Sequence, residues 1–292
     1  MRCTEITEYP INLIGIDKKI IFIPKVIVTN PNKKIFATYI YCYVRAGLDN
    51  VVDFSIGSLV RYFGYKTNSR KGRINEMFID SIRYLVDNNF IVADIDFDNL
   101  KLNTIMSITV NRDKSNSEND CNYFARLYVD ELLDILDYCK TSSINVINML
   151  SVFVYLRFEI GFRTTDNSDK SETFYHYYKQ ISEETKIGVQ TLYKIINALY
   201  IDLNLIYVAH VKYKCSDGNW VILPSIFCNY YRRKDGKVLD GGKHYYEKEV
   251  DRCYKQLIHR FKAYTDKSVS KSHKHNTIYE NKDTNYDWFE FE

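Results

Sequence analysis

The amino-acid sequence predicts an α+β protein, mainly α-helical with small β-hairpins, whose second half repeats the organisation of the first. Three observations support this prediction. Apolar residues recur at helical spacing in many segments, Pro and Gly are scarce (4 and 11 of 292 residues), and a pattern of short helix, turn, longer helix and hairpin occurs twice. With 46% hydrophobic residues, the chain can bury a core in each half.

Caps and apolar stripes define the elements of the first half. Ser55 is a good N-cap for a short helix, and Gly64 suits its end. Apolar residues then recur every three or four positions, which predicts a longer helix. In order, the sequence predicts an arm or edge strands at residues 11–29, a helix over Lys33–Ala46, the short helix between Ser55 and Gly64, a helix over Arg73–Asn88, and β-type runs at Phe90–Ala93 and Ile105–Val110.

A polar stretch, Lys114–Asn122, separates the halves, and the pattern then returns. The long apolar helix near the start of the second half is too short and too interrupted by polar residues to span a bilayer. In order, the sequence predicts a connecting element at Tyr123–Tyr138, the apolar helix Ser143–Gly161, a polar loop at Thr164–Glu172, helices Tyr178–Thr185 and Val189–Asn204 around a turn at Lys186–Gly188, strands Leu205–Tyr213 and Trp220–Leu223 around an Asp217-Gly218 tip, and a tail helix from Lys243 to Tyr264.

This order is that of two tandem winged helix-turn-helix domains, followed by a C-terminal helix and a disordered tail. We expect the first domain with its leading arm at residues 1–118, a linker element at 119–142, the second domain at 143–230, and a basic helix with an acidic-aromatic tail at 231–292.

The second half carries the sharper candidate DNA-binding surface. A short scaffold helix, a tight turn and an amphipathic helix would project a polar row away from the core. Such a helix can enter the major groove, where amide and ammonium groups contact base edges. The row consists of Gln190, Thr191, Tyr193, Lys194 and Asn197. The alternative is a helical hairpin that only packs against other elements.

The first half is more basic. Its turn from Gly64 to Arg73 leads into a helix N-terminus, which attracts anions, so we expect a phosphate clamp with polar side chains within reach of bases. The candidates are Lys66, Asn68, Ser69, Arg70, Lys71, Arg73 and Asn75. The alternative is a solvated loop. In the second hairpin, Lys212 and Lys214 are candidates for contact with the adjacent DNA backbone or the minor groove.

No enzymatic motif supports catalysis. The phosphate-binding GxxxxGK[ST] and GxGxxG patterns and the hydrolase GxSxG pattern are missing from the sequence. The seven cysteines are scattered, without CxxC pairs, which suits free thiols in the cytoplasm. Asp94, Asp96 and Asp98 alternate like metal ligands but lack the rest of a calcium loop. We expect a soluble, cytoplasmic, non-enzymatic protein without a metal or cofactor.

The segments 54–91 and 178–206, with the basic tail, resemble the tandem winged-helix replication initiators of plasmids and the replisome organisers of phages and mobile elements. The ending Asn285-Tyr286-Asp287-Trp288 is similar to the endings of some phage replication proteins. The resemblance implies binding to repeated origin sequences and recruitment of a host helicase loader or primase. In the tail, Trp288 and Phe291 are candidates for partner binding. The alternatives are a tail that folds back on the basic segment before it and competes with DNA, and an inert disordered end.

Sequence-specific double-stranded DNA binding in replication is therefore the function we expect. Two alternatives stay open. One is a winged-helix transcriptional regulator, and the other is a protein-interaction module that recruits replication machinery without binding DNA. The sequence determines neither the target site nor the oligomeric state.

Overall fold

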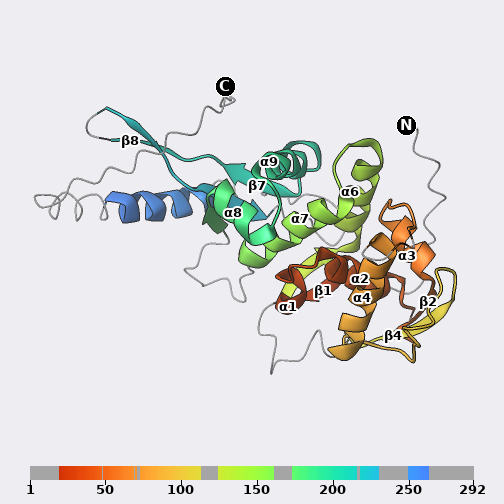
Figure 1. Cartoon of the computed structure of the whole chain (residues 1–292). Helices are drawn as coiled ribbons and strands as arrows, with labels where there is room; N and C mark the ends of the chain where they lie inside the picture. Colours follow the sequence, from red (N-terminus) through yellow and green to blue (C-terminus); the bar gives the residue numbers. More distant parts are fainter. Residues whose placement is uncertain are drawn as a thin grey trace, which may run out of the picture.

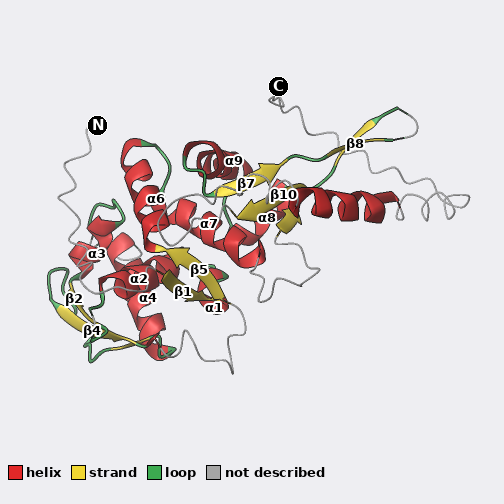
Figure 2. Cartoon of the chain, turned by 180° about the vertical axis from the view of Figure 1, so that it is seen from behind, coloured by secondary structure: helices red, strands yellow, loops and turns green. Residues whose placement is uncertain are grey.

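The computed structural model describes residues 20–47, 49–68, 70, 73–112, 124–160, 173–215, 218–229 and 249–262. Within these ranges the protein is a mixed α and β structure in which helices surround small antiparallel sheets of two or three strands (Figures 1 and 2). The predicted α+β class, mainly helical with small hairpins, is thereby confirmed.

The first half builds its helices around a three-stranded sheet. Its elements are β1 (Ile20–Pro24), α1 (Lys25–Val28), α2 (Lys33–Arg45), β2 (Val51–Phe54), α3 (Ile56–Tyr62), α4 (Ile74–Asp87), β3 (Ile91–Val92) and β4 (Met106–Val110). The strand order is β2-β4-β3. Ser55 caps α3 as expected, because its hydroxyl accepts from the Ser58 amide at 3.2 Å while the Ser58 hydroxyl accepts from the Ser55 amide at 3.0 Å.

The second half repeats this order and adds an outer hairpin. Its elements are α7 (Val146–Ile160), β6 (Thr173–His176), α8 (Tyr178–Thr185), α9 (Val189–Asn197) with a π-helical turn at Ala198–Asp202, β7 (Ile206–Ala209), β8 (Lys212–Lys214), β9 (Trp220–Ile222) and β10 (Ser225–Asn229). The three-stranded sheet has the order β6-β10-β7, and β8 pairs with β9 beyond it. A further helix covers residues 249–262.

Both halves therefore share one topology: helix, strand, helix, helix and two strands, with the last strand in the middle of the sheet. The helices α3 and α4 form a pair in the first half, and α8 and α9 form one in the second. The longer helix of each pair is followed by an Asn in the left-handed conformation, Asn89 (φ 56°) and Asn204 (φ 51°). The first strands of the two sheets, β2 and β6, were not among the predicted elements. Each is four residues long and pairs with a strand more than 45 residues away in sequence.

The two halves are joined by β5 (Phe124–Tyr128) and α6 (Val129–Thr141). β5 pairs antiparallel with β1, so the strand of the leading arm finds its partner in the linker element. The helices α2 and α7 contact each other, and one hydrophobic cluster contains buried residues of both halves. The halves thus share a continuous core.

A buried ion pair fixes the linker to the second half. Arg157 of α7 and Glu131 of α6 are 2% and 1% exposed, and the guanidinium donates to the Glu131 carboxylate. Arg157 also donates to the Arg126 carbonyl and to Asn229 Oδ1, both at 3.3 Å. Burial raises the pKa of Glu131, and the nearby guanidinium opposes that shift.

Candidate nucleic-acid interface

The polar row on α9 lies on the surface, as the sequence predicts. Leu192, Ile195 and Ile196 are buried against the core, so the rest of the short helix faces outward. The outward side chains are Gln190, Thr191, Lys194 and Asn197, all exposed. The helix contains no carboxylate. Its outer face therefore offers amide, hydroxyl and ammonium groups without a carboxylate on the same helix.

Tyr193 is a correction to the predicted row. Its ring is half-buried and stacks on Tyr178 of α8, with 4.1 Å between ring centroids and an interplanar angle of 9°. Tyr193 falls at the border of the buried stripe, where an aromatic ring gains more from packing on its neighbour than from exposure. It therefore joins the two helices of the motif, and its ring is not part of the outward row.

The turn between α8 and α9 is held by a local hydrogen bond. Lys186, which follows α8, adopts the left-handed conformation (φ 55°), so the chain reverses there before Gly188 begins α9. The Ser182 hydroxyl donates to the Ile187 carbonyl at 2.6 Å. This arrangement fixes the start of α9 relative to α8.

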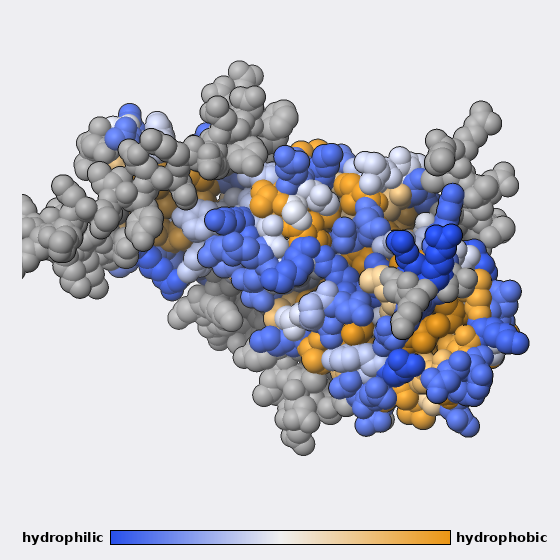
Figure 3. Space-filling view, viewed as in Figure 1, coloured by the Kyte–Doolittle hydropathy of each residue, from blue (hydrophilic) through white to orange (hydrophobic). Residues whose placement is uncertain are grey.

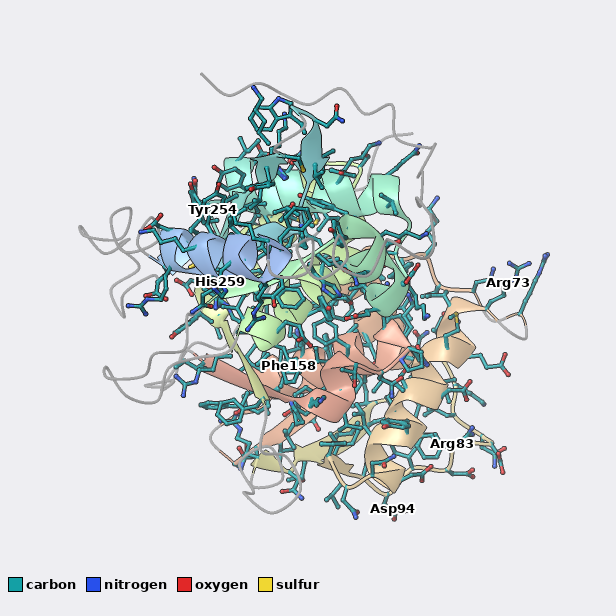
Figure 4. All side chains as sticks on the ribbon, turned by 90° about the vertical axis from the view of Figure 1, so that its left-hand side faces the viewer. Arg73, Arg83, Asp94, Phe158, Tyr254 and His259 are labelled. Carbon is teal, nitrogen blue, oxygen red and sulfur yellow. The ribbon has the colours of Figure 1, made fainter. Side chains whose placement is uncertain are left out.

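The basic turn of the first half is also at the surface. Gly64 (φ 74°) ends α3, with the Tyr65 amide donating to the Val60 carbonyl at 3.1 Å. The predicted candidates Lys66, Asn68, Arg70 and Arg73 are exposed. Figure 4 shows Arg73 at the edge of the molecule, far from the helix that carries His259. Ser69 and Lys71 lie outside the described residues, as do Trp288 and Phe291 of the tail.

Asn75 is a second correction. It is 6% exposed, and its Oδ1 accepts from the Asn68 amide at 3.0 Å. The Asn68 side chain in turn accepts from the Arg70 amide at 3.0 Å. A long turn needs partners for its backbone amides, so Asn75 orders the turn from inside and is not exposed for contact with bases.

The outward face of α4 differs from that of α9. It carries three acidic residues, Glu76, Asp80 and Asp87, while its exposed Arg83 lies 3.2 Å from the Asp80 carboxylate. The exposed cations of the preceding turn, Lys66, Arg70 and Arg73, are therefore followed by a mainly acidic helix face. Figure 3 also shows hydrophobic side chains at the surface around α3 and α4, whereas the surface over α8 is hydrophilic.

The loop at residues 93–104 folds back over this first motif. The Gly57 amide of α3 donates to the Leu102 carbonyl at 2.9 Å, and the Arg83 guanidinium lies 5.0 Å from the Phe97 ring centroid. Between loop and helices is an open hollow lined by Ile56, Arg70, Asn75, Glu76, Ile79, Leu100 and Leu102. Asp94, Asp96 and Asp98 are exposed, and a hydrogen bond from the Asn99 side chain lowers the pKa of Asp96.

The outer hairpin of the second half is basic and aromatic. Lys212 and Lys214, the predicted candidates, are exposed on β8. Sequence reasoning missed Trp220 of β9, which is 63% exposed and has the Lys214 ammonium 5.9 Å from its ring centroid. A Trp in a short strand suggests burial, and its outward position follows only from how the hairpin leaves the domain (Figure 1).

A cavity of about 260 Å³ with both polar and apolar lining lies where the halves meet, between α1–α2 and α7–α8. Glu184 accepts there from Tyr155, and one of its oxygens is 3.1 Å from His176 Nε2. On the opposite wall, burial and the neighbouring Lys34 lower the pKa of Lys33 to about 8. The cavity adjoins the turn before α9, since Thr185 and Lys186 line it.

The described residues contain no group of three or more His, Cys, Asp or Glu side chains suited to hold a metal ion. No helix among them is both long and apolar enough to cross a membrane. No family model matches the chain, and no curated protein matches its sequence significantly.

Proposed function

We propose that this chain is a double-stranded DNA-binding protein made of two winged helix-turn-helix units, with α9 as the helix that contacts bases. The repeated topology supports the winged-helix assignment, because each half has the helix-strand-helix-helix-strand-strand order of that fold. The observation that carries the proposal is the exposed row on α9, which is free of carboxylates and backed by buried Leu192, Ile195 and Ile196.

The residues fall into two proposed roles. Gln190 and Lys194 lie within the first two turns of α9 and suit contacts with base edges in the major groove. Lys66, Arg70 and Arg73 of the first turn suit contacts with phosphates, which add affinity without sequence preference. Thr191 and Asn197 extend the first set along the same outward side.

Fluorescence anisotropy with duplexes from the gene's own neighbourhood tests both roles. We expect Gln190→Ala with Lys194→Ala to reduce the preference for the best site over random DNA by about tenfold or more. We expect Arg70→Ala with Arg73→Ala to weaken binding to all duplexes about equally and to reduce the salt dependence by about two ions. Unchanged binding by both double variants, with the fold intact by circular dichroism, would exclude the proposal.

For the biological role we propose initiation or organisation of replication of a plasmid, phage or mobile element, on the resemblance stated above. Directly repeated binding sites beside the gene would support this role, and palindromic sites at promoters would support a transcriptional regulator instead. Loss of replication of a small plasmid that depends on this gene, when Gln190 and Lys194 are replaced, is the decisive measurement.

A second candidate function has its own support in the first half. The acidic face of α4, with exposed Met77 and the hollow next to Ile79, fits a protein partner better than a phosphate backbone. In this alternative the first unit recruits replication machinery, and α9 alone contacts DNA. In this alternative, Asp80→Lys should reduce the amount of replication protein that the chain recovers in a pull-down, whereas Lys194→Ala should not.

A further inference from the structure

We infer that the β8–β9 hairpin is a second DNA site, specific for unpaired bases, with Trp220 as the stacking surface and Lys214 beside it for the adjacent phosphate. The inference rests on the proposed DNA-binding function, but it concerns other residues and another form of DNA. It assigns a role to the most exposed aromatic side chain among the described large hydrophobic residues.

The surroundings of Trp220 select the ligand. Its ring is 63% exposed, and the Lys214 ammonium lies 5.9 Å from the ring centroid. The described residues of the two strands and their flanks, 211–215 and 218–223, include Lys212 and Lys214 but no carboxylate, and the sequence between them contains one, Asp217. Aromatic rings combined with cations are the means by which proteins hold single strands, since every base has a face to stack.

The form of the DNA follows from access to that face. In a duplex both faces of a base are covered by its neighbours, and flipping a base out costs a few kcal/mol. The minor groove is only about 6 Å wide, which is narrow for an indole carried on a two-stranded ribbon. An unpaired strand offers its bases without these costs, so it is the ligand that the hairpin fits.

The hairpin is presented on a firm base. Val211 and Leu223 flank its strands and belong to a small separate core with Leu257 of the helix at residues 249–262. Tyr213 packs edge-on against Phe261 of the same helix, with ring centroids 5.4 Å apart. Both views show the hairpin and this helix extending from the same side of the second half, away from the first (Figures 1 and 2).

A single-tryptophan variant tests the inference directly. The chain has two Trp residues, so Trp288→Phe leaves Trp220 as the sole indole. We expect an oligothymidine of about 15 nucleotides to quench its fluorescence at saturation. In anisotropy measurements with the same labelled strand, Trp220→Ala should lower affinity by about tenfold or more, and Trp220→Phe, which keeps a ring, should lower it less.

The controls distinguish this inference from the proposed function. Ile105→Ala removes a side chain that is 69% exposed in the hairpin of the first half, and it should leave single-strand binding unchanged. Unaltered Trp220 emission with saturating oligothymidine, or full affinity in Trp220→Ala, would overturn the inference even if α9 binds duplex DNA. An equal loss for duplex and single strand would also overturn it, because the hairpin would then be a duplex contact. Quenching by the single strand without any duplex binding would uphold the inference and refute the role of α9.

Discussion

The helices α4 and α9 occupy corresponding places in the two halves, which share one order of helices and three-stranded sheet, yet their outer faces carry different charges. Glu76, Asp80 and Asp87 make the face of α4 acidic, whereas α9 has Lys194 and no carboxylate. The hairpins differ in the same sense. The loop of the first half carries exposed aspartates, and β8 of the second carries exposed lysines.

The charges on the outer faces of α4 and α9 therefore vary independently of the framework that the two halves share. Buried stripes and caps build the same framework twice, while the solvent-facing positions decide what each copy can bind. In the first half the exposed Lys66, Arg70 and Arg73 lie in the long turn before α4, whereas Arg83 of α4 lies beside the Asp80 carboxylate. In the second half Lys194 lies on the exposed face of the helix itself.

The buried ion pair between the linker helix α6 and α7 of the second half should give the largest change in stability. Arg157→Met should lower the free energy of unfolding by about 3–5 kcal/mol, because it leaves the buried Glu131 carboxyl without its counterion. Urea unfolding at neutral pH measures this.

The matched controls use the other half and the other partner. Arg83→Met removes an exposed pair of the first half and should cost less than about 1 kcal/mol. Adding Glu131→Met to Arg157→Met should recover much of the loss, since no buried charge is then left over. Equal effects of Arg157→Met and Arg83→Met would contradict the role given to burial.

The second expected effect compares the two outer faces in binding. Lys194→Glu places a carboxylate on α9 and should weaken duplex binding by about 10–100-fold, through repulsion by phosphates and base acceptors. Arg83→Glu makes the same change on α4 and should alter binding by no more than about threefold, as that face is already acidic. Anisotropy with one duplex measures both. A larger effect at Arg83 would assign base contact to the first half instead.

The third expected effect has opposite signs in the two turns. Gly64→Ala puts a side chain at φ 74° and should destabilise the protein by about 1 kcal/mol. Lys186→Gly relieves a left-handed residue at φ 55° and should stabilise it by up to about 1 kcal/mol. Thermal unfolding of both variants measures these changes. Unfolding temperatures that shift in the same direction would contradict the prediction that the left-handed backbone governs stability in both turns.

The smallest expected effect lies in the cavity between the halves. Lys33 has a folded-state pKa of about 8, below the 10.5 of an unperturbed lysine, so folding favours its neutral form. The burial of the charged Lys33 ammonium lowers the free energy of unfolding by its full amount below pH 8. This cost disappears as the pH rises toward 10.5. Lys33→Met should therefore stabilise the protein at pH 7 by about 1 kcal/mol, allowing for partial exposure, and by less at pH 10. A gain that grows with pH would contradict this.

The helices were predictable because their signals are local. The caps at Ser55 and Gly64 and the apolar stripe of α9 depend on residues within a few positions of one another. The strands β2 and β6 were missed because their four residues have little pattern of their own, and their partners, β4 and β10, lie far along the chain. The pairing of β1 with β5 is non-local in the same way.

The candidate site was predictable to a similar extent. Helical spacing places Gln190, Lys194 and Asn197 on the outside, and they are exposed. The same reasoning placed Tyr193 and Asn75 outside, where stacking on Tyr178 and a hydrogen bond to the Asn68 amide decide otherwise. The position of Trp220 depends on the direction in which a hairpin leaves the domain, which no local pattern contains.

The shared core of α2 and α7 has a consequence for the geometry of any DNA that both halves touch. Two modules on a flexible tether tolerate variable spacing between their sites. Here the separation is built into the protein interior. Inserting about five base pairs between the two contacted segments would turn one of them to the far side of the double helix, and the protein could not follow without breaking its own packing.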